Sequence, residues 1–209
     1  MGTFKRTIGD RVVHLSCEPA QGPQAQWVFD ALERANAREK LAAGTKVRVG
    51  WTTLSLAAQG SGLQVREPDY EKDPERGTLA DLTGTLTVLS WQRDVLARVG
   101  VEGVAVDFLE RVVVEGGALD EPQVQLLRSK GASPGDSGWS IGQVDEDEEE
   151  DALESLRVCD LLHSRPALLQ AMTLPPGYLV VFDGDEIQSV DDPSGKDVWG
   201  SAAPAKGDR

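Results

Sequence analysis

An unbroken run of seven acidic residues, 145–151, places the strongest constraint on how this chain can fold. Adjacent carboxylates repel one another and bury no apolar surface, so the run has to stay in solvent between two folded elements. The sequence Gly135-Asp136-Ser137-Gly138-Trp139 stands shortly before it. Its glycines and short polar side chains are typical of a tight turn, which here ends in a large aromatic residue. We therefore expect a turn and a dense block of negative charge next to each other on the surface.

The formal net charge of −14 is unevenly distributed along the 209 residues. Residues 1–70 hold 9 Lys and Arg against 7 Asp and Glu, residues 71–130 hold 7 against 11, and residues 131–209 hold 5 against 17. The acidity therefore belongs to the C-terminal third. Such a field repels nucleic-acid phosphates and anionic lipid, and it speeds the encounter with a basic partner. We expect a protein partner with a basic surface, and neither nucleic acid nor membrane.

The compartment follows from what the sequence does not contain. No window approaches the roughly 20 apolar residues that span a bilayer, and no apolar signal core follows the first residues. These features predict a cytoplasmic protein, in which the two cysteines, Cys17 and Cys159, would stay reduced.

The N-terminal half reads as mixed strand and helix. Residues 3–8 and 11–17 predict two strands joined by a Gly-Asp turn, and the spacing of Val28, Leu32 and the alanines between and after them predicts an amphipathic helix from Pro23 to about residue 43. Residues 46–58 alternate with a change of phase, which indicates one strand with a bulge, followed by a return strand over 63–66. The polar stretch 67–77 predicts an exposed loop.

A second helix is expected over residues 82–99, closed by a glycine. Residues 104–114 and 124–128 predict strands, residues 152–172 a helix interrupted at Pro166, and residues 178–182 a buried strand. The fold class is α+β, with a mainly antiparallel sheet flanked by two or three helices and possibly two small subdomains. We place an N-terminal α+β domain of unknown role in residues 1–100, a second domain in 101–190, and a flexible tail in 191–209.

The sequence around Ser137 also resembles the turn that carries the nucleophile of trypsin-like serine proteases. A serine nucleophile needs a base within hydrogen-bond reach, which here would have to be His14 or His163. The protease pattern continues with a second glycine where this chain has Trp139, and its disulfides and histidine-bearing loop are missing. The context favours a structural turn, and we expect no catalytic residues.

Trp139 has two interpretations. Its indole either fills the core beneath the turn or sits in a shallow pocket as an anchor for a partner, and burial in the core is the more common fate of tryptophan near sheet ends.

Metal binding is weakly supported. The histidines and cysteines form the pairs His14/Cys17 and Cys159/His163, a composition that a zinc site uses. On a strand, positions three apart point to opposite faces, which argues against the first pair. The acidic run lacks the alternating ligand spacing of a calcium loop. We predict neither a metal nor a cofactor.

The turn, the glycine after it and the acidic cluster together resemble the bacterial immunity-protein domain numbered thirty-three in the polymorphic-toxin classification, over roughly residues 110–190. The chain departs from that family after the turn, where Gly142 to Glu146 replaces a more compact Gly-Asp-Glu. The resemblance implies a protein without catalysis that neutralises a cognate toxin by binding it. The candidate partner-binding residues are Asp136, Ser137, Gly138, Trp139, Asp145, Glu146 and Asp147. The alternative function is a regulatory or accessory binding module unrelated to toxins.

Overall fold

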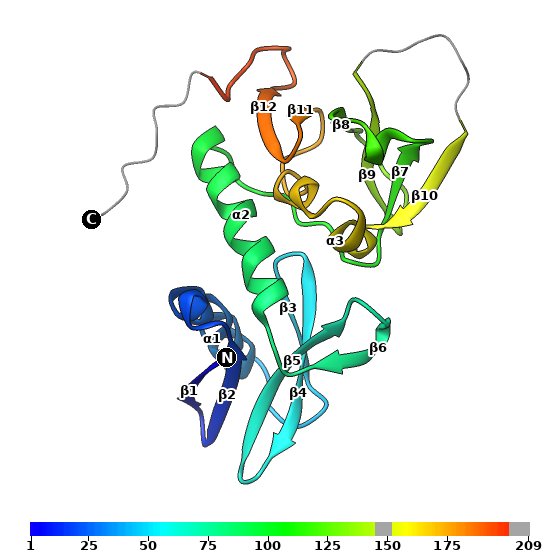
Figure 1. Ribbon diagram of the computed structural model, residues 1–209. Coiled ribbons are helices and arrows are strands. Elements are labelled where there is room, and N and C mark those ends of the chain that lie inside the picture. Colours follow the sequence, from blue (N-terminus) through cyan, green and yellow to red (C-terminus); the bar gives the residue numbers. More distant parts are fainter. Residues whose placement is uncertain (145–151, 201–209) are drawn as a thin grey trace. The chain divides into compact units, whose positions relative to one another are not determined.

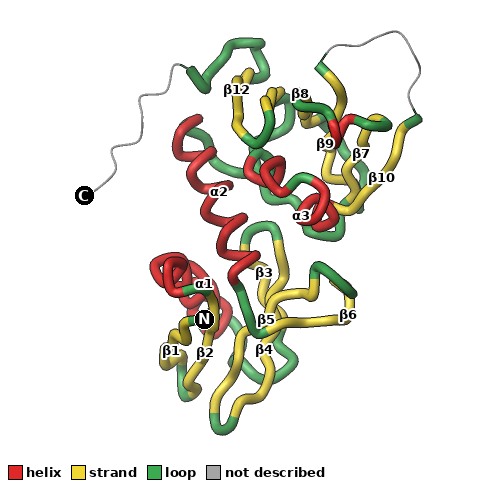
Figure 2. The backbone as a smooth tube through the Cα atoms, viewed as in Figure 1, coloured by secondary structure: helices red, strands yellow, loops and turns green. Residues whose placement is uncertain are grey.

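A computed structural model describes residues 1–144 and 152–200 of the chain (Figure 1). The chain folds into two compact units, Met1–Ser90 and Trp91–Arg209. The division falls inside the long helix α2 (Thr83–Val99), ten residues before the boundary expected at 100. Each unit has its own sheet, and the α+β class is confirmed. Figure 2 shows how strands dominate both units and how few helices accompany them.

The first unit is built on a six-stranded mixed sheet. The order is β1-β2-β5-β4-β3, with β6 paired to β5, and β2 and β5 are the only parallel neighbours among the described strands of this unit. The strands are β1 (Gly2–Ile8), β2 (Arg11–Cys17), β3 (Lys46–Val49), β4 (Thr52–Gln59), β5 (Gly62–Asp69) and β6 (Asp73–Leu79). The β1–β2 hairpin and its Gly-Asp turn are confirmed.

The prediction of one bulged strand over residues 46–58 is wrong. The chain reverses at Gly50 and Trp51, so that β3 and β4 form a hairpin. Gly50 has a φ of +58°, and a Cβ on it would lie 2.3 Å from Leu89 Cδ2, so both its conformation and its surroundings require glycine. The change of phase in the sequence marks this reversal.

The prediction of an exposed loop over residues 67–77 is also wrong. Strand β5 continues to Asp69, and β6 returns beside it. Glu67 is only 6% exposed and accepts a hydrogen bond from the backbone N–H of Thr85 at 3.0 Å. Tyr70 is buried, and its hydroxyl donates to Thr52 Oγ1 at 2.6 Å. Glu67 and Tyr70 are therefore satisfied inside the unit, whereas the charged residues of the turn and of β6 stay exposed.

Two helices accompany this sheet. The short turn η1 (Pro19–Gln21) leads into α1 (Gly22–Asn36). Of the expected stripe, this helix buries Val28 and Leu32, whereas the two alanines at 31 and 35 are half-buried. The helix ends seven residues before the expected residue 43, because Asn36 Oδ1 turns back and accepts from the N–H of Leu41 at 3.2 Å. Helix α2 agrees with its predicted bounds, and Gly100 follows it with a φ of +77°.

The second unit holds the other mixed sheet, ordered β10-β7-β9-β8-β11-β12, with β7 and β9 parallel. The strands are β7 (Arg111–Glu115), β8 (Gln123–Arg128), β9 (Asp136–Gln143), β10 (Leu153–Arg157), β11 (Leu179–Asp183) and β12 (Glu186–Asp191), and the helical turns are η2 (Ala118–Asp120), η3 (Val158–Asp160), α3 (Leu161–Ser164) and η4 (Pro166–Gln170). The strands expected over residues 124–128 and 178–182 are confirmed as β8 and β11.

Two expectations for this unit are wrong. The strand expected from residue 104 begins only at Arg111. The interrupted helix expected over residues 152–172 starts instead as β10, because these residues pair with β7, and then breaks into short helical turns. Of the tail expected over residues 191–209, the structure describes residues 191–200, where Arg98 stacks on the Trp199 ring, its Cζ atom 3.5 Å from the ring centroid. Residues 201–209 lie outside the described residues.

Candidate functional site

The predicted turn at residues 135–139 is the beginning of the central strand β9. Gly135 and Gly138 have φ values of +89° and +78°, and Asp136 Oδ1 accepts from the Gly138 N–H at 2.8 Å. A Cβ on Gly138 would meet the carbonyl oxygen of Ser129 at 3.1 Å. The two glycines thus allow the chain to bend into the sheet between β7 and β8. The residues that look like a turn in the sequence form the start of a strand.

Ser137 is used to join two strands. Its Oγ donates to the carbonyl of Arg111 at 2.6 Å and accepts from the N–H of Trp139 at 3.2 Å, and the residue is 3% exposed. A nucleophile would instead give its proton to a base in an open pocket. His163 lies exposed on α3, and His14 belongs to the other unit. The geometry around Ser137 supports the structural interpretation.

Trp139 fills the core of the second unit. It is 1% exposed, its Nε1 donates to the Met172 carbonyl at 2.9 Å, and the Arg128 guanidinium lies 5.7 Å from its ring centroid. Of the sequence-predicted partner-binding residues, Ser137, Gly138 and Trp139 are therefore buried and Asp136 is half-buried. Direct contact of a partner with the Ser137 or Trp139 side chain does not fit this structure. Asp145, Glu146 and Asp147 lie outside the described residues.

An acidic corner, which the sequence did not indicate, is held by one buried arginine. Arg165 is 7% exposed and donates to three carbonyl oxygens: Glu121 at 2.6 Å, Pro122 at 3.0 Å and Gly184 at 2.7 Å. The N–H of Gly184 also donates to the Pro122 carbonyl at 2.7 Å. These bonds tie the chain entering β8 to the β11–β12 turn. The acidic corner comprises the exposed residues that these two segments carry: Asp120, Glu121, Asp183, Asp185 and Glu186.

The acidic corner adjoins a hollow of about 240 Å³. Glu121 and Asp183 line it from one side, and Gln143 and Val144 at the end of β9 line it from the other. The residues that follow Val144 in the sequence are all acidic up to residue 151. Within residues 1–144 and 152–200, no Lys, Arg or His forms an ion pair with the five carboxylates of the corner. The corner therefore presents negative charge that the described part of the chain does not pair.

An apolar face lies next to these charges. Alternate residues of these strands point away from the core. Among them, Leu127 and Leu153 are 44% and 73% exposed. With Val113 and Leu179 they line a second hollow of about 260 Å³. This sheet face therefore exposes apolar side chains to solvent.

The cysteine and histidine pairs do not form a metal site in the structure. Among the described residues, no three His, Cys, Asp or Glu side chains are grouped closely enough to hold a metal ion. Cys159 is buried, and burial raises the pKa of its thiol to about 11.

The comparisons with known proteins decide the family. The sequence model of the Imm33-like domain matches residues 91–200, which is more than half of the chain. The chain belongs to the Imm33-like family. The match begins at Trp91, where the second unit begins, so this unit is the Imm33-like domain. It confirms the resemblance seen over residues 110–190 and extends it to the second half of α2 and to the turn after β12. No curated protein and no solved structure matches the chain.

The Imm33-like family assignment indicates an immunity-type protein. In the part of the chain that is described, no helix is long and apolar enough to cross a membrane. The sequence signals for the acidic corner were weak. Asp183-Gly184-Asp185-Glu186 has the composition of a hairpin turn, but nothing local to Arg165 indicated that it is buried.

Proposed function

We propose that this Imm33-like protein binds a cognate protein toxin through the acidic corner and neutralises it by covering its active site, with no bond made or broken. The observation that carries the proposal is a set of exposed, unpaired carboxylates on a backbone that Arg165 fixes in place. A fixed acidic surface binds Arg and Lys side chains through charge-assisted hydrogen bonds without first being ordered.

The distribution of charge between the two units supports the same function. Residues 1–90 hold 11 Lys and Arg and 11 Asp and Glu, whereas residues 91–209 hold 10 and 24, so the whole net charge of −14 belongs to the unit that contains the Imm33-like domain. Such a field raises the association rate with a basic partner. A basic active site is typical of enzymes that act on anions, so we propose a nuclease or a similar enzyme as the toxin.

The adjacent apolar face completes a protein-binding surface. Leu127, Leu153 and Leu179 lie on the face of the sheet that faces away from the core. In protein interfaces the affinity comes mostly from a few buried apolar or aromatic anchors, and the charged rim sets the association rate and the choice of partner. The apolar face would supply the anchors, and the acidic corner together with Asp145, Glu146 and Asp147 would supply the rim.

Co-expression with a candidate toxin encoded beside the gene tests this function. The wild-type chain should restore growth, and the double variant Asp183→Lys/Asp185→Lys should fail to do so. The matched control Asp94→Lys/Glu102→Lys makes the same charge change on exposed residues of the same unit and should still protect. Rescue by both variants would refute toxin binding through the acidic corner. A wild-type chain that protects against no such toxin would favour the alternative function, a regulatory or accessory binding module.

A further inference from the structure

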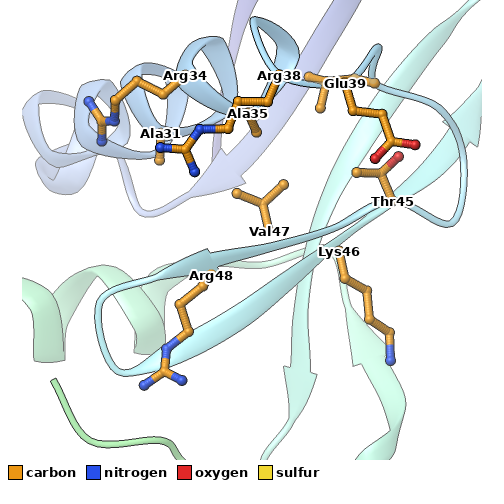
Figure 3. Close-up of a pocket in the computed structure, with 10 residues that line it drawn as sticks. Ala31, Arg34, Ala35, Arg38, Glu39, Thr45, Lys46, Val47 and Arg48 are labelled. Atoms are coloured by element: carbon orange, nitrogen blue, oxygen red, sulfur yellow. The ribbon is translucent and has the colours of Figure 1, made fainter.

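A groove of about 360 Å³ lies between α1 and β3 in the first unit, outside the residues that match the Imm33-like domain (Figure 3). Its floor is formed by small or apolar side chains, Ala31 and Ala35 from α1 and Val47 from β3. In Figure 3, Val47 points toward α1, whereas Lys46 and Arg48 point to the opposite face of the strand. The groove therefore has an apolar floor with polar side chains above and below it.

Three cations that line the groove form no ion pair with the part of the chain that the structure describes. They are Arg34, Arg38 and Lys46, and all three are exposed. Arg48 Nε donates to the Gly50 carbonyl at 3.0 Å. Glu39 is the one carboxylate among the lining residues. Excess positive charge at this position, in a unit of zero formal net charge, is suited to an anionic ligand.

The two arginines lie at the C-terminal end of α1. Arg34 is in the last turn of the helix, and Arg38 follows two residues after the helix ends at Asn36. The C-terminal end of α1 stabilises a cation in its last turn, which accounts for Arg34. Lys46 extends from β3 toward the opposite face of the strand, so cations lie on both sides of the free edge of β3.

The strand beside the groove is at the edge of its sheet. Strand β3 pairs only with β4 in the described sheet, and Val47 and Val49 lie opposite Leu54 and Thr52. The N–H of Leu56 donates to the carbonyl of Thr45, so Thr45 and every second residue after it on β3 form the hydrogen bonds to β4. The peptide groups of Lys46 are therefore directed away from β4, as at any edge that accepts a further strand.

We propose that this groove binds an extended acidic segment of a partner protein, which adds to the edge of β3. Side chains alternate between the two faces of such a segment. Carboxylates on one face would meet Arg34 and Arg38, and those on the other would meet Lys46. Peptide hydrogen bonds to β3 would supply affinity, and the cations would select acidic sequences. Nucleic acid is the less suitable ligand, since it has no peptide groups to pair with an edge strand and the chain as a whole is strongly negative.

Fluorescence anisotropy with the full chain tests this site, using a short fluorescein-labelled peptide in which Glu alternates with Val. The double variant Arg34→Gln/Arg38→Gln should bind it about tenfold more weakly or worse, as expected for the loss of charge-assisted bonds. The matched control Lys72→Gln/Arg76→Gln neutralises two exposed cations elsewhere in the same unit and should leave the affinity unchanged. A peptide with Lys in place of Glu should not bind, and N-methylation of the peptide backbone should abolish binding.

Several results would overturn the proposal. Equal losses in the two double variants would show general attraction rather than a site, and tighter binding of a single-stranded oligonucleotide would show a nucleic-acid site. A variant with Asn and Gln at positions 145–151 that binds the peptide much more tightly would show that the chain's own acidic run occupies the groove. This proposal does not rest on toxin binding, because it concerns the other unit and its assay contains no toxin.

Discussion

Replacing Arg165 with methionine tests how the acidic corner is held. Methionine has a similar length and fills a similar volume, but it donates no hydrogen bond. The substitution removes the donor from the carbonyls of Glu121 and Gly184, and it leaves the Pro122 carbonyl with the Gly184 N–H alone. An unsatisfied buried acceptor costs about 1–3 kcal/mol. Because the corner opens to solvent and water can reach part of this backbone, we expect a total of about 3–5 kcal/mol.

Such a loss is a large fraction of the roughly 5–15 kcal/mol by which a domain is stable. Urea unfolding followed by tryptophan fluorescence measures it, because Trp139 reports on the same unit. Lys130→Met is the matched control, since it replaces an exposed cation of this unit and should change stability by less than about 0.5 kcal/mol. If Arg165→Met destabilises the protein no more than Lys130→Met does, the three bonds do not organise the corner. Arg165→Lys should fall between, since one ammonium cannot reach three divergent carbonyls.

Three further predictions concern other residues. Burial raises the pKa of Glu67 to about 7, so the folded state holds a proton that the unfolded state releases near its usual pKa. The free energy of unfolding should therefore fall by about 3 kcal/mol as the pH rises from 4.5 to 7. In urea unfolding at a series of pH values, Glu67→Gln should lose this slope, and a slope that the variant retains would belong to other groups. Gly138→Ala should cost about 2 kcal/mol in urea unfolding, more than Gly135→Ala, because both glycines have positive φ but only Gly138 has atoms within 4 Å of the added Cβ; equal costs would contradict this. Trp139→Phe should lower the free energy of unfolding by about 1–3 kcal/mol, because the hydrogen bond to the Met172 carbonyl is lost, and it should leave toxin affinity unchanged. Weaker toxin binding at unchanged stability, measured by calorimetric titration, would show that Trp139 anchors the partner.

The parts of the fold that the sequence predicted correctly depend on local pattern. The β1–β2 hairpin has alternating strands around a Gly-Asp turn, and α2 has a continuous apolar stripe and a closing glycine. These signals lie within one element, so no knowledge of distant residues is needed. The family resemblance added the identity of the second unit, which periodicity alone did not indicate.

The errors occurred where tertiary contacts override local composition. Residues 135–139 have the composition of a turn, but β7 and β8 on either side make them a central strand. Glu67 looks exposed by residue type, and the N–H of Thr85 makes its burial possible. In both cases the deciding partner is remote in the sequence.

The candidate site was only partly predictable for the same reason. Asp136 and the acidic run directed attention to the Imm33-like unit, but Ser137 and Trp139 are buried. The acidic corner comes from two segments that Arg165 brings together, Glu121–Pro122 and the β11–β12 turn. A buried arginine bound only to carbonyls has no sequence pattern, because its partners are backbone atoms that every residue possesses.

The most direct test of the central claim is the association rate of the purified protein with its toxin as a function of salt. For the wild-type chain the rate should be high at low ionic strength and fall steeply as salt is added. For Asp183→Lys/Asp185→Lys it should be at least about tenfold lower at low salt, with a flatter salt dependence, while Asp94→Lys/Glu102→Lys should behave nearly as the wild type. Identical rates and salt slopes for the wild type and both variants would contradict binding through the acidic corner.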